Sequence, residues 1–166
     1  MTLAMIMDHI LHSAISETFE GLVFEEVVLD SVAEADLSRN FEGSWWTKIE
    51  IFEPFHAEMV MVVKKELMVQ YTGALLGMLD DEMPDKKQVL DNLGELMNTI
   101  CGRVMALMLP PRKKFRLGLP ELGDNILPDL NGEFNSVNFL VGDDLVYFLV
   151  PRRFWEENFL NEVASS

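Results

Sequence analysis

The stretch DKKQVLDNLGELMNTICGRVMALML, residues 85–109, is the longest helical pattern in the chain. Its apolar residues recur every three or four positions, which is typical of a helix that buries one side. Pro110 and Pro111 follow at once, and proline ends a helix because its ring fixes φ and removes a backbone N–H donor. We therefore predict a long amphipathic helix over residues 85–109 at the centre of the fold.

Projection of this helix at about 100° per residue separates two faces. The predicted apolar stripe contains Leu93, Leu96, Met97, Ile100, Val104 and Leu107, and the opposite polar stripe contains Asp91, Glu95, Asn98 and Gly102. Side chains three apart project together from a helix surface, and a glycine lets a partner approach closely. From the residues alone, the polar stripe is either an ordinary solvated face or a docking surface.

The elements before this helix are predicted from their periodicity. We expect an amphipathic helix over residues 2–19 that ends near Gly21, strands at 22–29, 45–53 and 57–63, and a second helix at 64–78. The elements after it are mostly strands. We expect a short strand in KFRLGLP, a polar connection, a hairpin of strands 136–141 and 145–150 joined by GDD, and a terminal helix over 152–163.

Composition limits the function classes. The chain has 166 residues, which favours one domain over residues 1–166, and its 49% hydrophobic content can build a core. A formal charge of −15 disfavours nucleic acid and anionic membranes as partners. The single cysteine, the lack of an apolar run long enough to span a bilayer and the lack of an export signal favour a cytoplasmic protein.

Most familiar catalytic motifs are absent, including GxxxxGK[ST], GxSxG and HExxH. His9 and His12, with Glu17 and Glu20 downstream, have the spacing of metal ligands, but the simpler interpretation is the polar margin of a surface helix, so we predict no metal site. Cys101 is expected to be a buried spectator. The basic cluster RKKFR at 112–116 is interpreted as a solvated strand end, with docking of an acidic protein as the alternative.

The segment DNLGELMNTICG, residues 91–102, resembles the DxxxExxN signature, with a following glycine, of the CheC and CheX chemotaxis phosphatases. The preceding AEMVMVVKKELMVQYTGALLG and the following FRLGLP resemble the strand, helix and proline-ended strand that surround that signature, so the resemblance covers residues 57–120. CheC-type members usually carry the signature on two helices. The first helix here offers only SAISETFEG, so one active face is expected, as in CheX-type members.

The resemblance implies an α/β fold in an α+β arrangement, with two long helices packed on a mainly antiparallel sheet. It also implies a phosphatase that hydrolyses the aspartyl phosphate of a CheY-like response regulator in chemotaxis or a related two-component pathway. The alternative is a non-catalytic CheC-like adaptor that binds a receiver domain or a flagellar switch protein. Similar proteins form homodimers by pairing sheet elements, and we expect the apolar hairpin at 136–150 to provide the exposed edge.

The resemblance assigns the catalytic roles to Glu95 and Asn98, and partner binding to Asp91 and Gly102. Asn98 carries a neutral amide that can orient a water without repelling phosphate, whereas Glu95 is expected at the rim, paired with a cation of the receiver. This chain is expected to bind no cofactor, because the Mg²⁺ for the reaction belongs to the partner receiver domain.

Overall fold

The longest helix, α3, spans Lys86–Met108, within one residue of the predicted bounds at each end. The computed structural model describes residues 2–23 and 25–165 of the protein. Over these residues the other helices are α1 (Leu3–Val23), α2 (Lys65–Leu75), the 3-10 helix η1 (Arg152–Trp155) and α4 (Phe159–Ser165). The strands are β1 (Val27–Glu34), β2 (Asn40–Glu53), β3 (Ala57–Lys64), β4 (Arg116–Leu117), β5 (Glu121–Ile126), β6 (Phe134–Val141) and β7 (Asp144–Pro151).

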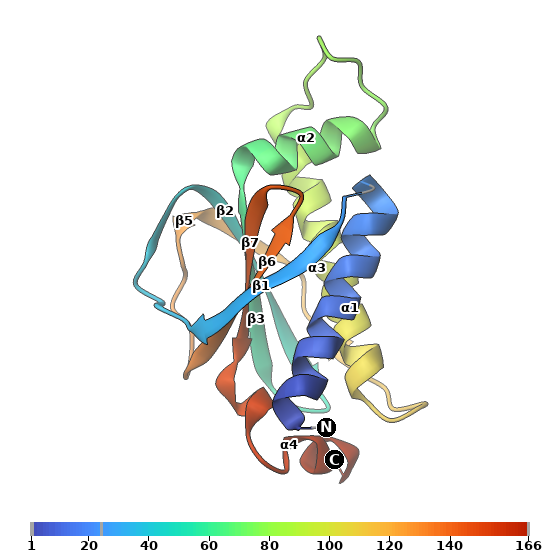
Figure 1. Ribbon diagram of the computed structural model, residues 1–166, viewed down its shortest axis with the longest axis vertical. Helices are drawn as coiled ribbons and strands as arrows, with labels where there is room; N and C mark the ends of the chain where they lie inside the picture. The colour runs from blue at the N-terminus through green and yellow to red at the C-terminus, as the bar shows by residue number, and fades with distance from the viewer. Residues whose placement is uncertain (1, 24, 166) are drawn as a thin grey trace.

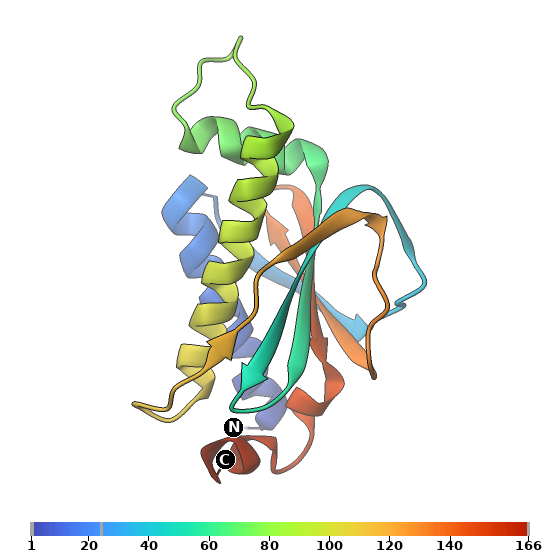
Figure 2. The same cartoon turned by 180° about the vertical axis from the view of Figure 1, so that it is seen from behind.

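These strands form one sheet in the order β1-β6-β7-β3-β2-β4, with β5 also paired to β2. Each recorded strand pair is antiparallel. The two long helices α1 and α3 lie side by side on one face of this sheet, as Figures 1 and 2 show. The predicted fold, an α+β arrangement of two long helices on an antiparallel sheet, is confirmed.

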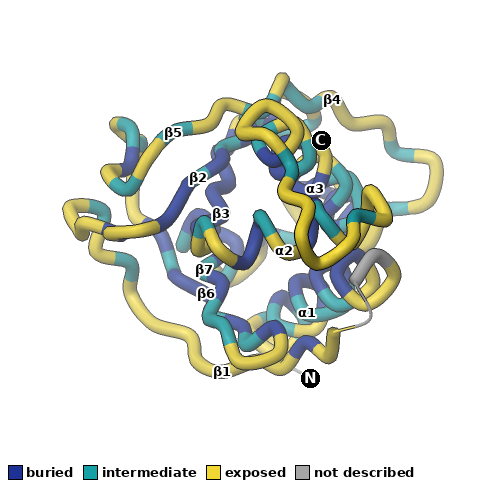
Figure 3. Tube along the Cα trace, turned by 90° about the horizontal axis from the view of Figure 1, so that it is seen from above, coloured by how far each residue is buried: buried dark blue, intermediate teal, exposed yellow. Residues whose placement is uncertain are grey.

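The main core lies between the helices and the sheet (Figure 3). Alternate residues of β2, such as Ile49 and Ile51, face this layer, whereas β3 is buried over almost its whole length, as expected for a central strand covered on both faces. A smaller cluster on the other face includes Phe41, Val60 and Leu149. None of the described helices is long and apolar enough to cross a membrane.

The amino-terminal elements differ from the prediction. The first helix ends at Val23, two residues past Gly21, but β1 starts only at Val27, so the strand expected at 22–29 was placed too early. Residue 24 of that expected strand lies outside the described residues. Glycine lowers helix stability by only about 1 kcal/mol, and tertiary packing of α1 outweighs that cost.

The carboxyl-terminal half brings two more differences. The polar connection contains a strand, β5, whose side chains are mostly exposed; its backbone pairing with β2, rather than an apolar pattern, defines it. The terminal helix is two short helices, η1 and α4. Its aromatic residues do group as predicted, since Phe154 and Phe159 are buried and stack at 4.7 Å between ring centroids.

The predicted hairpin is present, but it is not an edge of the sheet. Strand β6 pairs with β1 on one side and β7 pairs with β3 on the other. The prediction of an exposed sheet edge at the hairpin was therefore wrong. On this side of the sheet the edge strand is β1, where Val28, Leu29 and Val32 are 46%, 38% and 41% exposed.

Candidate functional site

Helix α3 begins with a capping box. The carboxylate of Asp85 accepts a hydrogen bond from the backbone N–H of Gln88 at 2.8 Å, and the Gln88 side chain accepts one from the backbone N–H of Asp85 at 2.9 Å. Two backbone donors that a helix start leaves without partners are thereby satisfied. The first turn of α3, which precedes Asp91, is fixed by its own sequence.

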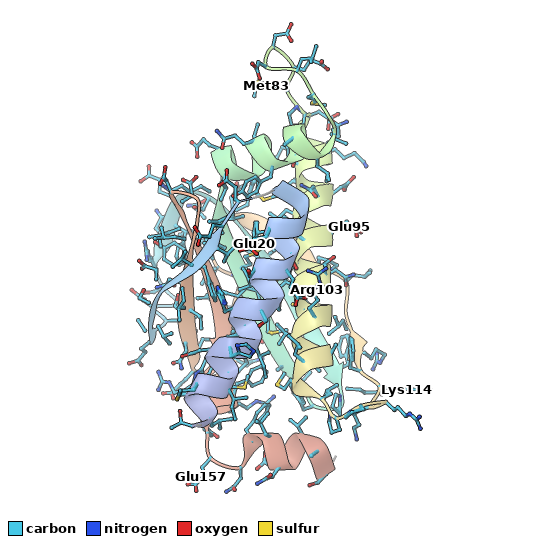
Figure 4. All side chains as sticks on the ribbon, turned by 45° about the vertical axis from the view of Figure 1, so that its right-hand side comes forward. Glu20, Met83, Glu95, Arg103, Lys114 and Glu157 are labelled. Carbon is cyan, nitrogen blue, oxygen red and sulfur yellow. The ribbon has the colours of Figure 1, made fainter. Side chains whose placement is uncertain are left out.

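The middle of α3 is held from three sides. Toward α2, the Asn92 amide donates to the Thr72 hydroxyl at 3.1 Å. Toward α1, the Arg103 guanidinium donates to the Thr18 hydroxyl at 3.0 Å, and Figure 4 shows Arg103 between the two helices. Toward the sheet edge, a Cβ built on Gly94 would lie 3.6 Å from Cβ of Pro120. These interactions attach residues 92–103 of α3 to α2, to α1 and to the segment before β5.

The predicted polar stripe faces solvent. Asp91, Glu95 and Asn98 are exposed and Gly102 is half-buried, so the four residues share one open face of α3. Cβ atoms three positions apart on a helix lie about 5–6 Å from each other, which places Glu95 and Asn98 within reach of one small group. Figure 4 shows Glu95 on the side of α3 away from the sheet core.

The apolar stripe is confirmed except for its last member. Leu93, Leu96, Met97, Ile100 and Val104 are buried, but Leu107 is 49% exposed. In its place Met105 and Met108 are buried and complete the stripe. Helix α3 ends at Met108, and Leu107 in its last turn lies outside the buried side of the helix.

Charge is distributed unevenly over the open face. Asp91 pairs with Lys87 one turn earlier, at 2.8 Å between Nζ and Oδ2, and this hydrogen bond raises the pKa of Lys87. Within the described part of the chain, the side chains of Glu95 and Asn98 have no hydrogen bond or ion pair. The carboxylate of Glu95 and the amide of Asn98 are therefore available to bind groups of another molecule.

Among the described residues, Gly102 has no packing partner outside its own stretch of helix. A Cβ built on it would meet no atom within 4 Å, and its backbone is in the ordinary helical conformation. A glycine inside a helix destabilises it by roughly 0.5–1 kcal/mol relative to alanine. Neither packing nor backbone geometry within the described chain accounts for that cost.

Helix α1 offers no second copy of this arrangement. Ala14 is buried, and Glu17 and Glu20 are exposed acids with no amide beside them. The Glu20 carboxylate accepts a hydrogen bond from the Val27 backbone, and His12 Nε2 lies 2.9 Å from the Val27 carbonyl oxygen. These α1 residues tie the helix to β1. Among the described residues, no group of three or more His, Cys, Asp or Glu is placed to hold a metal ion.

Cys101 and the basic cluster at 112–116 agree with the structural roles expected for them, a buried spectator and a solvated strand end. Cys101 is completely buried, and burial raises the pKa of its thiol, so it does not form a thiolate readily. The basic cluster at 112–116 is largely exposed and runs into β4. Arg116 lies over the Phe52 ring at 4.6 Å from its centroid.

Sequence reasoning did not find the residues that hold the site. Arg103 and Asn92 contact other helices, and neither pairing can be read from spacing within α3. The close approach of Gly94 and Pro120 was partly indicated by the sequence, because both residues lie inside the segments that resemble the CheC and CheX proteins. The ion pair of Lys87 with Asp91 follows the usual four-residue helix spacing and was the most accessible of these contacts.

Several solved structures have a fold similar to that of this chain. CheX from Desulfovibrio desulfuricans matches with a TM-score of 0.72 and 15% identity, covering 87% of this chain and 97% of that one. CheX in its complex with CheY, beryllium trifluoride and Mg²⁺, from Borrelia burgdorferi, matches with a TM-score of 0.70 and 14% identity, covering 86% and 95%. FliY from Thermotoga maritima matches with a TM-score of 0.64 and 14% identity, covering 94% and 90%. At these identities the likeness shows a shared fold.

The sequence itself carries the family assignment. No curated protein sequence matches the chain significantly. The family model described as "Chemotaxis phosphatase CheX" matches residues 47–131, which is just over half of the chain. That range contains β3, α2, the whole of α3 and the Pro120 contact with Gly94. The chain belongs to the CheX family of chemotaxis phosphatases.

Proposed function

We propose that this protein accelerates hydrolysis of the aspartyl phosphate on a CheY-like response regulator. The observation that carries the proposal is the exposed pair Glu95 and Asn98 on a helix fixed from three sides, inside the segment that matches the CheX family. Asp91 and Gly102 continue the same open face and would contact the receiver. The predicted catalytic and partner-binding residues thus share one surface.

Asn98 is the residue that would position the attacking water. Hydrolysis of a phosphoryl group needs a water in line with the bond that breaks, together with stabilisation of negative charge. A neutral amide has both a donor and an acceptor, so Asn98 can hold the water beside the phosphate without repelling it. The Mg²⁺ and the lysine that stabilise charge belong to the receiver in this proposal, and this chain supplies positioning.

Glu95 is assigned a different role. A carboxylate beside a phosphoryl group is repelled by it, so we place Glu95 at the rim, where it pairs with a cationic side chain of the receiver. That ion pair would set the depth at which Asn98 enters the site. Asp91, already paired with Lys87, would contribute to docking only.

A non-catalytic adaptor is the second candidate. The fold is shared with FliY, so the architecture alone does not specify a phosphatase. An adaptor that binds a receiver domain or a flagellar switch protein would use the same face of α3 without needing an acid and an amide one turn apart. The exposed, unpaired side chains of Glu95 and Asn98 favour catalysis.

We also propose that residues 1–166 act as one unit and assemble as a homodimer. One hydrophobic cluster contains residues from Met7 to Val163, which supports a single unit. The edge strand β1, with exposed Val28, Leu29 and Val32, is the place where a second copy would extend the sheet. A clean monomer in sedimentation at about tens of micromolar would contradict the dimer. We place the protein in the cytoplasm, with no nucleic acid or membrane partner.

The decay of phosphorylated receivers from the same cell, with and without the protein, tests the proposal. The phosphatase proposal predicts faster decay of at least one CheY-like receiver in the presence of Mg²⁺. Binding of a receiver without faster decay would favour the adaptor. Neither binding nor acceleration for any receiver would contradict both.

A further inference from the structure

The most exposed large apolar side chain among the described residues lies beside the α3 face. Leu119 is 88% exposed, more than Met83 at 75% or Leu79 at 68%. It precedes Pro120, the residue that packs against Gly94, and Gly94 is the immediate neighbour of Glu95. In Figure 2 the segment that leads from β4 to β5 runs alongside α3.

A single exposed leucine is common and needs no explanation by itself. Leu119 differs because the residues before and after it, Gly118 and Pro120, both lie close against other parts of the chain. The backbone N–H of Gly118 donates to the Glu50 carbonyl at 2.7 Å, and a Cβ on Gly118 would come within 3.0 Å of the Phe52 ring. On the other side, Pro120 approaches α3 at Gly94, where an added Cβ would lie 3.6 Å from the proline ring.

The strands on either side hold this connection as well. Leu117 pairs with Ile51 and Glu121 pairs with Lys48, so both ends of the segment are bonded to β2. The Glu121 carboxylate also lies 3.2 Å from Nζ of Lys48. Pro120 further restricts the backbone of the residue before it to extended conformations. Leu119 is therefore an apolar side chain on a backbone that is held at both ends, so binding has little backbone left to order.

We infer that Leu119 is an apolar anchor that the phosphorylated receiver buries when it docks on α3. The inference rests on the proposed function, because the receiver is the partner placed over Glu95 and Asn98. A globular domain of about 100 residues has a radius of gyration of about 13 Å. A partner of that size centred over Glu95 extends past Gly94 and the adjoining Pro120, and so reaches the position of Leu119, the residue before Pro120.

Two substitutions separate this anchor from a merely structural residue. Leu119→Ser removes the apolar side chain, and Leu119→Met keeps it. The matched control is Ile126→Ser on β5, since Ile126 is also apolar and 55% exposed but pairs with Asn40 at the far end of β2. Because Leu119 contacts so little of its own chain, Leu119→Ser is expected to leave the melting temperature unchanged.

The assay measures binding and catalysis separately. Binding is measured with a CheY-like receiver saturated with beryllium fluoride and Mg²⁺, and catalysis with the phosphorylated receiver at saturating phosphatase. Burying a leucine is worth roughly 1.5–3 kcal/mol, so its loss should weaken binding by about tenfold or more. The maximal decay rate should stay unchanged. Leu119→Met and Ile126→Ser should bind like the unsubstituted protein.

Each outcome decides the inference. Weaker binding of Leu119→Ser alone, at an unchanged maximal rate, supports the anchor. Unchanged binding, or a lower maximal rate at unchanged binding, overturns it while the proposed function stands if the unsubstituted protein accelerates decay. If the unsubstituted protein binds a receiver without acceleration, the phosphatase proposal fails but the binding comparison still tests Leu119. If it neither binds nor accelerates any receiver, the proposed function fails and the anchor fails with it.

Discussion

Gly102→Ala is expected to change stability and receiver binding in opposite directions. The position lies inside α3 with helical backbone, and the added methyl group would meet no atom of the described residues outside its own stretch of helix within 4 Å. Alanine in place of a mid-helix glycine stabilises by roughly 0.5–1 kcal/mol. For a domain of this length, 1 kcal/mol shifts the melting temperature by about 2–4 °C, so the variant should melt about 1–4 °C higher.

Binding should weaken because the same methyl group lies on the docking face. If the receiver packs closely over Gly102, the methyl must displace partner atoms, and overpacking a well-fitted contact costs typically 1–3 kcal/mol. That range corresponds to roughly 5-fold to 150-fold weaker binding. The assay is titration with a receiver saturated with beryllium fluoride and Mg²⁺, beside a thermal melt of each variant.

Gly21→Ala in α1 is the matched control. Gly21 is also a helical glycine whose added Cβ would meet no described residue outside its own stretch of helix within 4 Å, but it lies outside the polar stripe of α3. It should melt at the same temperature as the unsubstituted protein or slightly higher, and bind the receiver equally well. A Gly102→Ala protein that gains stability and binds normally would refute the assignment of Gly102 to the interface.

Three further substitutions test the site and its support. Glu95→Gln should weaken receiver binding and lower the maximal decay rate together, with a smaller salt dependence of binding, because it removes the rim charge; a variant with unchanged binding would contradict the rim role. Asp91→Asn should weaken binding less than Glu95→Gln and leave the maximal rate unchanged, since Asp91 is already paired with Lys87. Titration of the two variants side by side shows which one binds the receiver more weakly, and a larger loss for Asp91→Asn would contradict its minor role. Asp85→Ala removes the capping box and should lower stability by about 1 kcal/mol in urea unfolding; an unchanged midpoint would show that the cap is dispensable.

The fold was predictable where one periodicity dominates. Helix α3 was placed within one residue because its apolar stripe and the two prolines after it agree, and the capping box at Asp85 in the structure is consistent with both. The β6–β7 hairpin was equally clear, because two apolar strands flank a short polar turn with Gly142 at positive φ. Local signals and tertiary structure coincide in these elements.

The prediction failed where tertiary contacts decide the outcome. Strand β5 has a polar sequence and exists through its pairing with β2. The place of the hairpin within the sheet depends on β1, whose pairing with β6 spans more than 100 residues of sequence. Local periodicity contains no information about such long-range pairing, so the edge was assigned to the wrong strand.

The candidate face was predictable from spacing, but its support was not. Asp91, Glu95, Asn98 and Gly102 share a face because helix geometry requires it, and the structure places all four on the open side of α3. The residues that immobilise this face come from elsewhere, as with Thr18 on α1 and Pro120 near β5. Those partners became visible only when the helices and the sheet were assembled.

The most direct test of the catalytic assignment is the decay of a phosphorylated CheY-like receiver in the presence of Asn98→Ala. Gln70→Ala, which removes another exposed amide from a helix, is the matched control. The account predicts that Asn98→Ala loses acceleration by about 100-fold or more while it still binds the receiver saturated with beryllium fluoride, and that Gln70→Ala retains full activity. Near-normal acceleration by a folded Asn98→Ala protein would contradict the assignment of this face of α3 as the catalytic one.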